Sequence, residues 1–113
     1  MPDSPLLIEQ VEGPTDGQRT LRLSGPITLV NLFEFQNRLR KDDSQLLILD
    51  FANVPYIDSA GIGALVGGYV SRNNKGLGLA LVGVNQRVRD ALTITQVEKF
   101  FTFYPSVAAA SQA

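Results

Sequence analysis

Cysteine and histidine are both absent from this 113-residue sequence. Without cysteine the chain has no disulfide framework, no zinc–cysteine site and no thiol nucleophile. Without histidine it lacks the commonest general base and metal ligand, and a serine nucleophile would have no imidazole to activate it. We therefore expect a binding module rather than an enzyme, and we expect no cofactor.

Long apolar runs are missing as well. No uninterrupted apolar stretch approaches the roughly 20 residues that a membrane span requires. The first residues, Met1 to Pro5, lack the basic region and the long apolar core of a signal peptide. We therefore expect a cytoplasmic protein that has no contact with a membrane.

Basic charge is not concentrated anywhere in the chain. The ten Lys and Arg residues are scattered and the formal net charge is −1, so the electrostatic footprint of a nucleic-acid binder is missing. Hydrophobic residues make up 44% and charged residues 19%, which is typical of a soluble globular protein. The length fits one domain, which we place over residues 1–113 and expect to be a monomer.

The clearest pattern begins at Asp58, which is predicted to start a helix. Its side chain can accept hydrogen bonds from the free backbone N–H groups of the first turn. Apolar residues then recur at the spacing of a single helix face. This predicted buried face consists of Ile62, Leu65, Val66, Tyr69 and Val70. The helix is expected to end near Asn73, with Gly76 as a left-handed stop.

The opposite side of this helix carries only small residues, namely Ala60, Ala64, Gly67 and Ser71. A solvated helix face usually displays charged or long polar side chains, and each glycine in a helix interior costs about 0.5–1 kcal/mol relative to alanine. Either another element of the chain covers this side, or a partner docks closely on it. We favour the docked partner.

The residues before this helix predict a hairpin and a first helix. Strands are expected from Leu6 to Val11 and from Arg19 to Ser24, joined by turn residues. Thr28 is then expected to cap a helix that runs to about Lys41. The inward side of that helix is expected to carry Leu29, Leu32, Phe33 and Leu39.

Two segments that are almost wholly apolar, Leu46 to Phe51 and Leu77 to Val84, flank the organising helix. Such segments are typical of parallel strands that are covered on both faces, and the first is predicted to be the central strand. Asn85 is expected to cap a third helix. A short strand from Phe100 to Tyr104 and a small helix from Val107 are expected to follow.

From Leu47 to Gly63 the sequence reads LILDFANVPYIDSAGIG. An apolar strand that ends in an aspartate, a short link, and Asp58-Ser59-Ala60-Gly61-Ile62-Gly63 at the start of a helix together resemble the signature of STAS domains. These are the anti-sigma factor antagonist domains, which are also found on sulfate transporters. The resemblance implies an α/β fold, with a mixed four- to five-stranded sheet and helices packed mainly on one side.

The resemblance also implies a function. Domains of this family bind an anti-sigma factor that is itself a serine kinase of the histidine-kinase-like ATPase fold, and so free a sigma factor. The kinase phosphorylates the first serine after the aspartate, which corresponds to Ser59 here, and a serine phosphatase reverses the reaction. Ala60 stands where the most familiar form has a second serine. The predicted partner-binding residues are Asp58, Ser59, Ala60, Gly61, Ala64, Gly67 and Ser71.

Other functions have weaker support. A dinucleotide-binding loop must follow its strand at once, whereas nine residues separate Gly61 from the central strand, and there is no Walker motif. A hydrolase built on Ser59 would have only a lysine such as Lys75 as its base. Asp50 and Asp58 could hold Mg²⁺ weakly, although aspartates at such positions more often cap loops and helices. The main alternative is a non-phosphorylated adaptor subunit in a stress-signalling or lipid-transport assembly.

Overall fold

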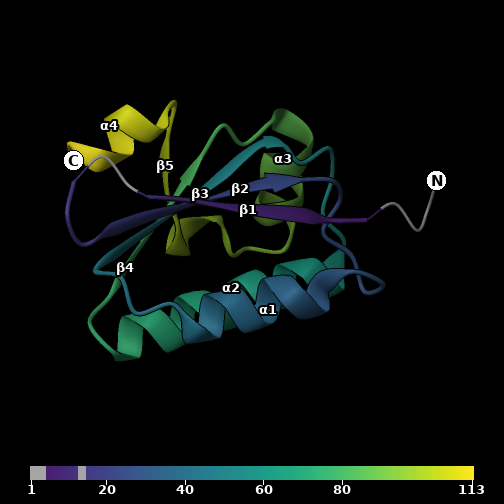
Figure 1. Ribbon diagram of the computed structural model, residues 1–113. Coiled ribbons are helices and arrows are strands. Elements are labelled where there is room, and N and C mark those ends of the chain that lie inside the picture. Colours follow the sequence, from purple (N-terminus) through teal and green to yellow (C-terminus); the bar gives the residue numbers. More distant parts are fainter. Residues whose placement is uncertain (1–4, 13–14) are drawn as a thin grey trace.

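The computed structural model describes residues 5–12 and 15–113, which form one α/β arrangement of strands and helices (Figure 1). The elements in chain order are β1 (Leu7–Glu12), β2 (Gln18–Ser24), α1 (Leu32–Lys41), β3 (Leu46–Asn53), α2 (Ser59–Asn74), β4 (Gly78–Val82), α3 (Gln86–Ile94), a 3₁₀ turn (Glu98–Phe100), β5 (Thr102–Tyr104) and α4 (Val107–Ser111). In the described residues, no helix is both long enough and apolar enough to cross a bilayer.

The strands form one mixed sheet in the order β1-β2-β3-β4-β5. β1 and β2 pair antiparallel as the predicted hairpin, and the other neighbours are parallel, each connected through a helix. The register places Leu21, Leu49 and Leu81 side by side on three neighbouring strands. The predicted central strand, β3, is central, and the predicted fold class is confirmed.

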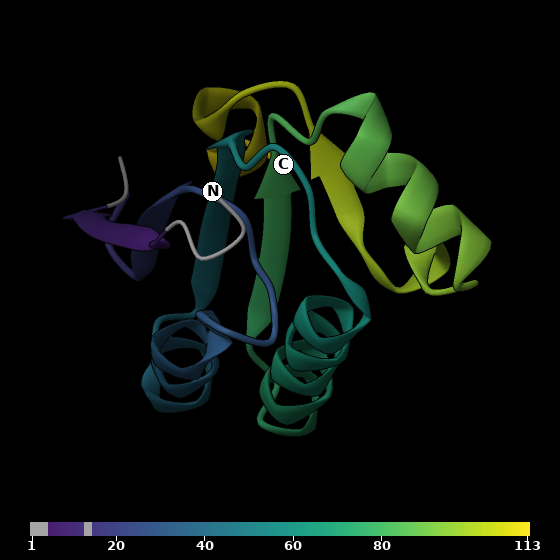
Figure 2. The same cartoon turned by 90° about the vertical axis from the view of Figure 1, so that its right-hand side faces the viewer.

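Both faces of β3 are covered, as its apolar sequence predicts. Leu47, Leu49 and Phe51 point into the main core, to which α1, α2 and α3 all contribute. Ile48 points to the other face and packs in a smaller cluster with Ala110 of α4. Figure 2 shows α1 and α2 together on one side of the sheet and α4 on the opposite side.

Helix α1 begins later than predicted, and its inward face is different. Thr28 does not cap it: within the described residues the buried Thr28 hydroxyl has no hydrogen-bond partner. Asn31 instead closes a turn, since its Oδ1 accepts from the Thr28 N–H at 2.8 Å and its Nδ2 donates to the Pro26 carbonyl. The helix then starts at Leu32, so Phe35 faces the core and Phe33 faces solvent. Leu29, which lies before the helix, is exposed too.

Helix α2 begins and ends as predicted. Asp58 is its N-cap, and the chain leaves the helix through Gly76 at φ +74°. Ile62 and Leu65 of the predicted inner face are buried, but Val70 at the outer end of that face is 47% exposed. Asn85 caps α3 as expected, by accepting from the Val88 N–H at 2.8 Å.

Candidate functional site

The N-terminus of α2 is fixed to the loop that connects β2 to α1. The Asp58 N–H donates to the Ile27 carbonyl at 3.1 Å, and the Ile27 N–H donates to the Tyr56 carbonyl at 3.2 Å. Ile27 and Ile57 thereby form an isolated parallel bridge. Two segments that lie 30 residues apart in the sequence are therefore joined where α2 begins.

The Asp58 carboxylate makes two further bonds at this point. Its Oδ1 accepts from the Gly61 N–H at 2.8 Å, which satisfies one of the free donors of the first turn. Its Oδ2 accepts from the Leu29 N–H at 3.1 Å. The carboxylate thus caps α2 and also holds the neighbouring loop.

Gly61 is required by a close backbone approach. A Cβ atom at this position would lie 2.3 Å from the Ile27 carbonyl oxygen and 2.7 Å from Ile57 Cγ1. Backbone atoms cannot yield as a flexible side chain can, so any larger residue would push α2 away from the loop. Gly61 is buried and faces the interior of the chain, where a partner cannot reach it.

Ser59 is the first residue of α2, and its side chain is exposed. In the part of the chain that the structure describes, no hydrogen bond to another residue restrains its hydroxyl. The positive end of the helix dipole and the backbone N–H groups of the first turn favour an anion at this position. Ser59 is therefore both accessible and in a place where a phosphate is tolerated.

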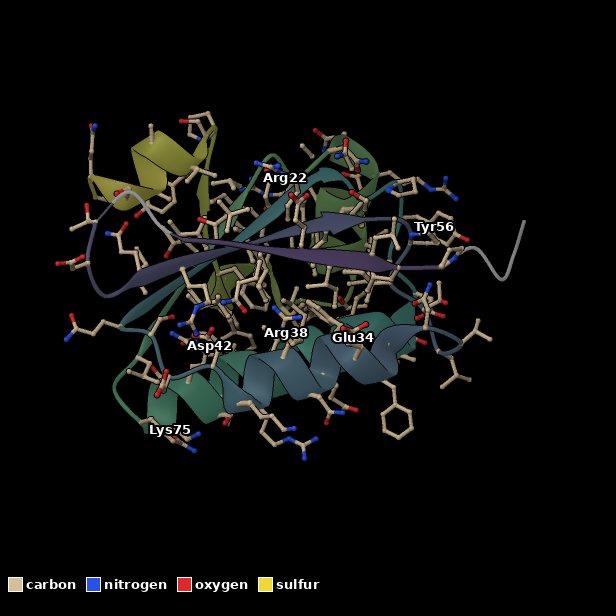
Figure 3. All side chains as sticks on the ribbon, in the orientation of Figure 1. Arg22, Glu34, Arg38, Asp42, Tyr56 and Lys75 are labelled. Atoms are coloured by element: carbon tan, nitrogen blue, oxygen red, sulfur yellow. The ribbon has the colours of Figure 1, made fainter. Side chains whose placement is uncertain are left out.

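An aromatic residue and a cation lie on the other side of this helix start. The Arg87 guanidinium stacks over the Tyr56 ring at 4.9 Å from its centroid. Figure 3 shows Tyr56 at the end of the molecule where α1 and α2 begin, with Asp42 and Lys75 towards the opposite end.

The small-residue side of α2 is divided between α1 and solvent. Ala64 is 4% exposed, and a Cβ on Gly68 would lie 2.5 Å from Leu39 Cδ1 of α1. Gly63 and Gly67, by contrast, have no atom within 4 Å of an added Cβ. A groove of about 210 Å³ runs between the two helices. It is lined by Gln36, Arg40, Ala64, Gly67, Gly68 and Ser71.

The predicted partner-binding residues differ in how exposed they are to solvent. Of the predicted partner-binding residues, Gly61 and Ala64 are buried inside the chain, against the β2–α1 loop and α1 respectively. Ser59 and Gly67 are exposed, and Asp58, Ala60 and Ser71 are partly exposed. Gly63, which was not among the predicted partner-binding residues, is also exposed and open.

An exposed apolar segment beside α2 was also missed. Leu29, Val30 and Phe33, which we call the apolar segment, are 76%, 72% and 78% exposed. Apolar side chains that gather on a surface mark sites of interaction more often than isolated ones do. The apolar segment is joined to the start of α2 through the bond between Leu29 and Asp58. The sequence pattern placed Leu29 and Phe33 in the core, because it assumed a helix that starts too early.

The two aspartates considered as metal ligands are engaged separately. Asp50 accepts from the Ala52 N–H at 3.0 Å and lies 3.7 Å from the Arg22 guanidinium. Asp58 binds the two backbone N–H groups described above. Among residues 5–12 and 15–113, no group of three or more acidic, histidine or cysteine side chains is arranged to hold a metal ion.

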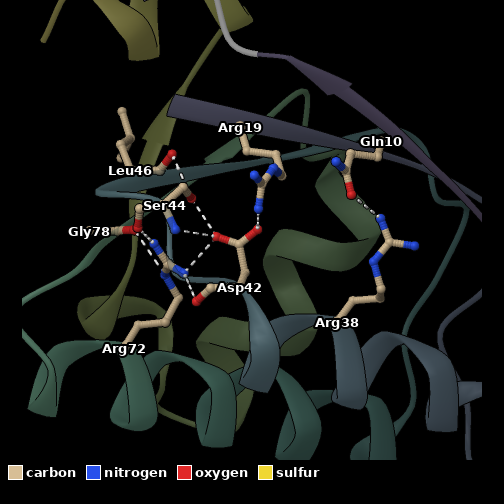
Figure 4. Close-up of polar contacts among 8 residues, drawn as sticks. All are labelled: Gln10, Arg19, Arg38, Asp42, Ser44, Leu46, Arg72 and Gly78. Carbon is tan, nitrogen blue, oxygen red and sulfur yellow. Dashed lines mark hydrogen bonds and ion pairs between the residues drawn. The ribbon is translucent and has the colours of Figure 1, made fainter. Parts of the chain in front are cut away.

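A buried ionic cluster closes the opposite end of the molecule (Figure 4). Arg72 near the end of α2 is 1% exposed. Its guanidinium donates to the carbonyls of Asp42, Ser44 and Gly78, and to Asp42 Oδ1 at 3.1 Å. Asp42 Oδ2 in turn pairs with Arg19 at 2.9 Å. Nothing in the sequence pattern marked Arg72 as an internal residue.

The environment of this cluster shifts the pKa of Asp42 and of Arg72. Burial raises the pKa of Asp42, but hydrogen bonds from Ser44 and the contact with Arg19 outweigh it and hold that pKa below its ordinary value. Burial lowers the pKa of Arg72, although Asp42 opposes the change. Asp42 therefore stays ionised at neutral pH, opposite two guanidinium groups. The cluster is remote from Ser59 and supports the fold rather than the candidate site.

Comparison with known proteins gives one family and a consistent set of structures. The family model described as "STAS domain" matches residues 8–110. An anti-sigma factor antagonist from Mycobacterium paratuberculosis is 23% identical, with a TM-score of 0.82, over 100% of this chain and 98% of that one. The anti-sigma factor antagonist SpoIIAA in its unphosphorylated form is 14% identical, with a TM-score of 0.75, over 94% and 95% of the two chains. A sulfate transporter family protein from Wolinella succinogenes is 25% identical, with a TM-score of 0.66, over 87% of each chain.

Proposed function

The chain belongs to the STAS domain family, and on that premise we propose that it is an anti-sigma factor antagonist that phosphorylation of Ser59 switches off. Its partner is an anti-sigma factor with serine kinase activity, and a serine phosphatase restores the active form. The domain acts by binding and catalyses no reaction itself. The single observation that carries this proposal is the exposed Ser59 hydroxyl at the N-terminus of α2, on the same helix as two exposed glycines on which nothing packs.

The modification itself is a phosphoryl transfer from ATP held by the partner. The Ser59 Oγ forms a bond to the γ-phosphorus while the bond from that phosphorus to the β,γ-bridging oxygen breaks, and ADP leaves. The hydroxyl proton passes to a base of the kinase. Hydrolysis by the phosphatase adds water across the phosphate ester, regenerates the hydroxyl and releases inorganic phosphate.

The surface around Ser59 suits a partner that approaches closely. Gly63 and Gly67 carry no side chain and nothing packs on them, although each costs the helix about 0.5–1 kcal/mol relative to alanine. The apolar segment is joined to the start of the same helix through the bond from Leu29 to Asp58, and it exposes three large side chains. A partner that covered both would bury apolar area and explain the retained glycines.

The direction of the switch follows from two unequal energies. A phosphate on Ser59 adds about −1.5 to −2 charges at neutral pH. In the free domain the helix N-terminus stabilises it by up to about 1 kcal/mol, partly cancelled by neighbouring Asp58. At a docked interface the same group would lose water beside small apolar residues, which costs several kcal/mol. We therefore expect binding to be lost while the fold survives.

The test uses the purified domain and each anti-sigma factor of the same genome that carries a histidine-kinase-like ATPase domain. One of them should bind the domain and transfer radiolabelled phosphate from ATP to Ser59. Affinity should fall at least a hundredfold for the phosphorylated domain and for Ser59→Asp, whereas Ser59→Ala should bind without being labelled. Ser71→Ala, on the same helix, is the control for the site of labelling and should still be phosphorylated. Labelling that persists in Ser59→Ala, or unchanged affinity after phosphorylation, would refute the proposal.

The alternative is an adaptor subunit in a stress-signalling or lipid-transport assembly, in which Ser59 only opens the helix. We retain this second function because the chain is also similar to a sulfate transporter family protein. The affinity measurements of the same experiment separate the two functions. An adaptor would bind its partner equally well whether residue 59 is serine, aspartate or alanine.

A further inference from the structure

The two oxygens of the Asp58 carboxylate hold different parts of the candidate site. Oδ1 accepts from the Gly61 N–H and caps α2, while Oδ2 accepts from the Leu29 N–H of the apolar segment. Backbone bonds between residues 27, 56 and 58 fix the chain just before the apolar segment. The bond from Leu29 to Asp58 is the contact that ties the apolar segment itself to the residue preceding Ser59.

We propose that Asp58 is a positioning residue that couples the charge on Ser59 to the apolar segment. In the unmodified domain Asp58 holds Leu29, and with it the adjacent Val30, against the start of α2. A phosphate on Ser59 displaces the carboxylate from the Leu29 N–H, so Leu29 and Val30 leave their docking position beside Phe33. This inference rests on the proposed function, because it takes Ser59 as the residue that is modified.

The chemistry of the displacement follows from adjacency. A phosphate brings about −1.5 to −2 charges and three strong acceptor oxygens to the residue that directly follows Asp58. It repels the carboxylate and competes with it for the N–H groups of the first helical turn. The bond to Leu29 is the weaker of the two that Asp58 makes, because it is longer, at 3.1 Å against 2.8 Å, and more exposed to water. It should therefore be lost first.

The fold predicts that this release is local. The bridge between Ile27 and Ile57 does not involve the carboxylate, so the loop stays anchored when Asp58 moves. Leu29 and Val30 are each more than 70% exposed, so their displacement changes the surface without opening the core. Phe33 stays in place, because it belongs to α1, which is anchored by buried Phe35 and Leu39. Phosphorylation would consequently alter both halves of the docking surface, one by its charge and the other by its position.

Asparagine at position 58 isolates the proposed contact. It caps a helix about as well as aspartate does, so its single oxygen can still accept from the Gly61 N–H. Its amide nitrogen is a donor and cannot accept from the Leu29 N–H. Asp58→Asn should therefore break the bond to the apolar segment and keep the cap of α2.

The experiment measures amide–solvent exchange by NMR on the full ¹⁵N-labelled chain, without any partner. We expect the Leu29 amide to exchange at least tenfold faster in Asp58→Asn and in protein with phosphoserine installed at position 59, while the Gly61 amide of Asp58→Asn changes less than twofold. Ser59→Ala should leave Leu29 unchanged. Phosphoserine installed at position 71 supplies the same charge farther along α2, and should also leave Leu29 unchanged.

Three results would overturn the inference. The first is a Leu29 amide that changes less than twofold in Asp58→Asn, which would mean that the bond does not hold the apolar segment. The second is a Leu29 amide that responds to Asp58→Asn but not to phosphoserine at position 59. The third is an equal response to phosphoserine at position 71. The proposed function fails separately, through unchanged affinity for the kinase, because the exchange measurement involves no partner.

Discussion

Gly67→Ala should make the domain more stable, which is unusual for a substitution at a suspected binding surface. Gly67 lies in the interior of α2, where glycine costs about 0.5–1 kcal/mol relative to alanine. A Cβ at this position meets no atom within 4 Å, so no packing penalty offsets the gain. We expect the free energy of unfolding to rise by about 0.5–1 kcal/mol. Gly63→Ala should behave alike, for the same reason.

The size of the effect can be measured. Unfolding entropy near the melting temperature is roughly 2.1 cal/mol/K per residue, or about 240 cal/mol/K for this chain, so Tm should rise by about 2–4 °C. Gly68→Ala is the matched control on the same helix. Its Cβ would lie 2.5 Å from Cδ1 of the buried Leu39, and overpacking of about 1–3 kcal/mol should exceed the gain in helix propensity and lower Tm.

The assay is calorimetry and urea denaturation of the three variants beside the parent. A Gly67→Ala variant that is less stable than the parent would refute the claim that this glycine is dispensable to the fold. A Gly68→Ala variant that gains as much as Gly67→Ala would refute the assigned contact between α1 and α2. If Gly67→Ala is more stable but binds its partner more weakly, the glycine is retained for docking.

Three further predictions test the rest of the structure. Gly67→Arg should keep the fold and weaken partner binding by at least about 2 kcal/mol. Ala64→Arg should instead lower the free energy of unfolding by about 2 kcal/mol or more, because Ala64 is buried. Equal stability of the two arginine variants in urea would contradict the placement of α1. Arg72→Ala should lower the free energy of unfolding by about 3–5 kcal/mol, because it removes the buried guanidinium that pairs with Asp42. A loss under about 1 kcal/mol by urea denaturation would disprove the stabilising role of this pair. The pKa of Asp42 is held below its unfolded value of about 3.9, so its stabilising contribution is present above that pH and is lost as pH falls through the folded pKa. The free energy of unfolding of Asp42→Asn should accordingly fall less steeply than that of the parent below about pH 4. Parallel curves for the two proteins would contradict the assigned role of the Asp42 carboxylate.

The features that could be predicted from the sequence are those whose signal lies within a few consecutive residues. The apolar run of β3 indicates a strand covered on both faces, and Asp58 before a helical stripe indicates a cap, because each signal is contained within a few residues. The motif from Asp58 to Gly63 indicated the family for the same reason. These predictions are confirmed by the fold and by the family match.

The errors arose where a local pattern is compatible with two arrangements. Whether Phe33 or Phe35 faces the core depends on where α1 starts, and that is decided by the turn that the Asn31 side chain closes. A small residue such as Ala64 indicates close approach but not whether α1 or a partner approaches. Arg72 looks like an ordinary surface arginine until the connection before β3 and the start of β4 bring carbonyl groups around it.

The Arg72 cluster also divides the domain into parts that should open by different routes. Its guanidinium binds groups on residues 28 to 30 positions away in the sequence as well as on nearby Gly78, so no one of these segments can leave without stranding a buried charge. Opening there should require global unfolding, with hydrogen-exchange protection close to the global limit. The start of α2 is held by backbone bonds to residue 27 and by one partly exposed carboxylate, with no buried charge, so it should open at a lower free energy. A single helix would then join a rigid half of the molecule to an adaptable one, and the adaptable half is where Ser59 lies.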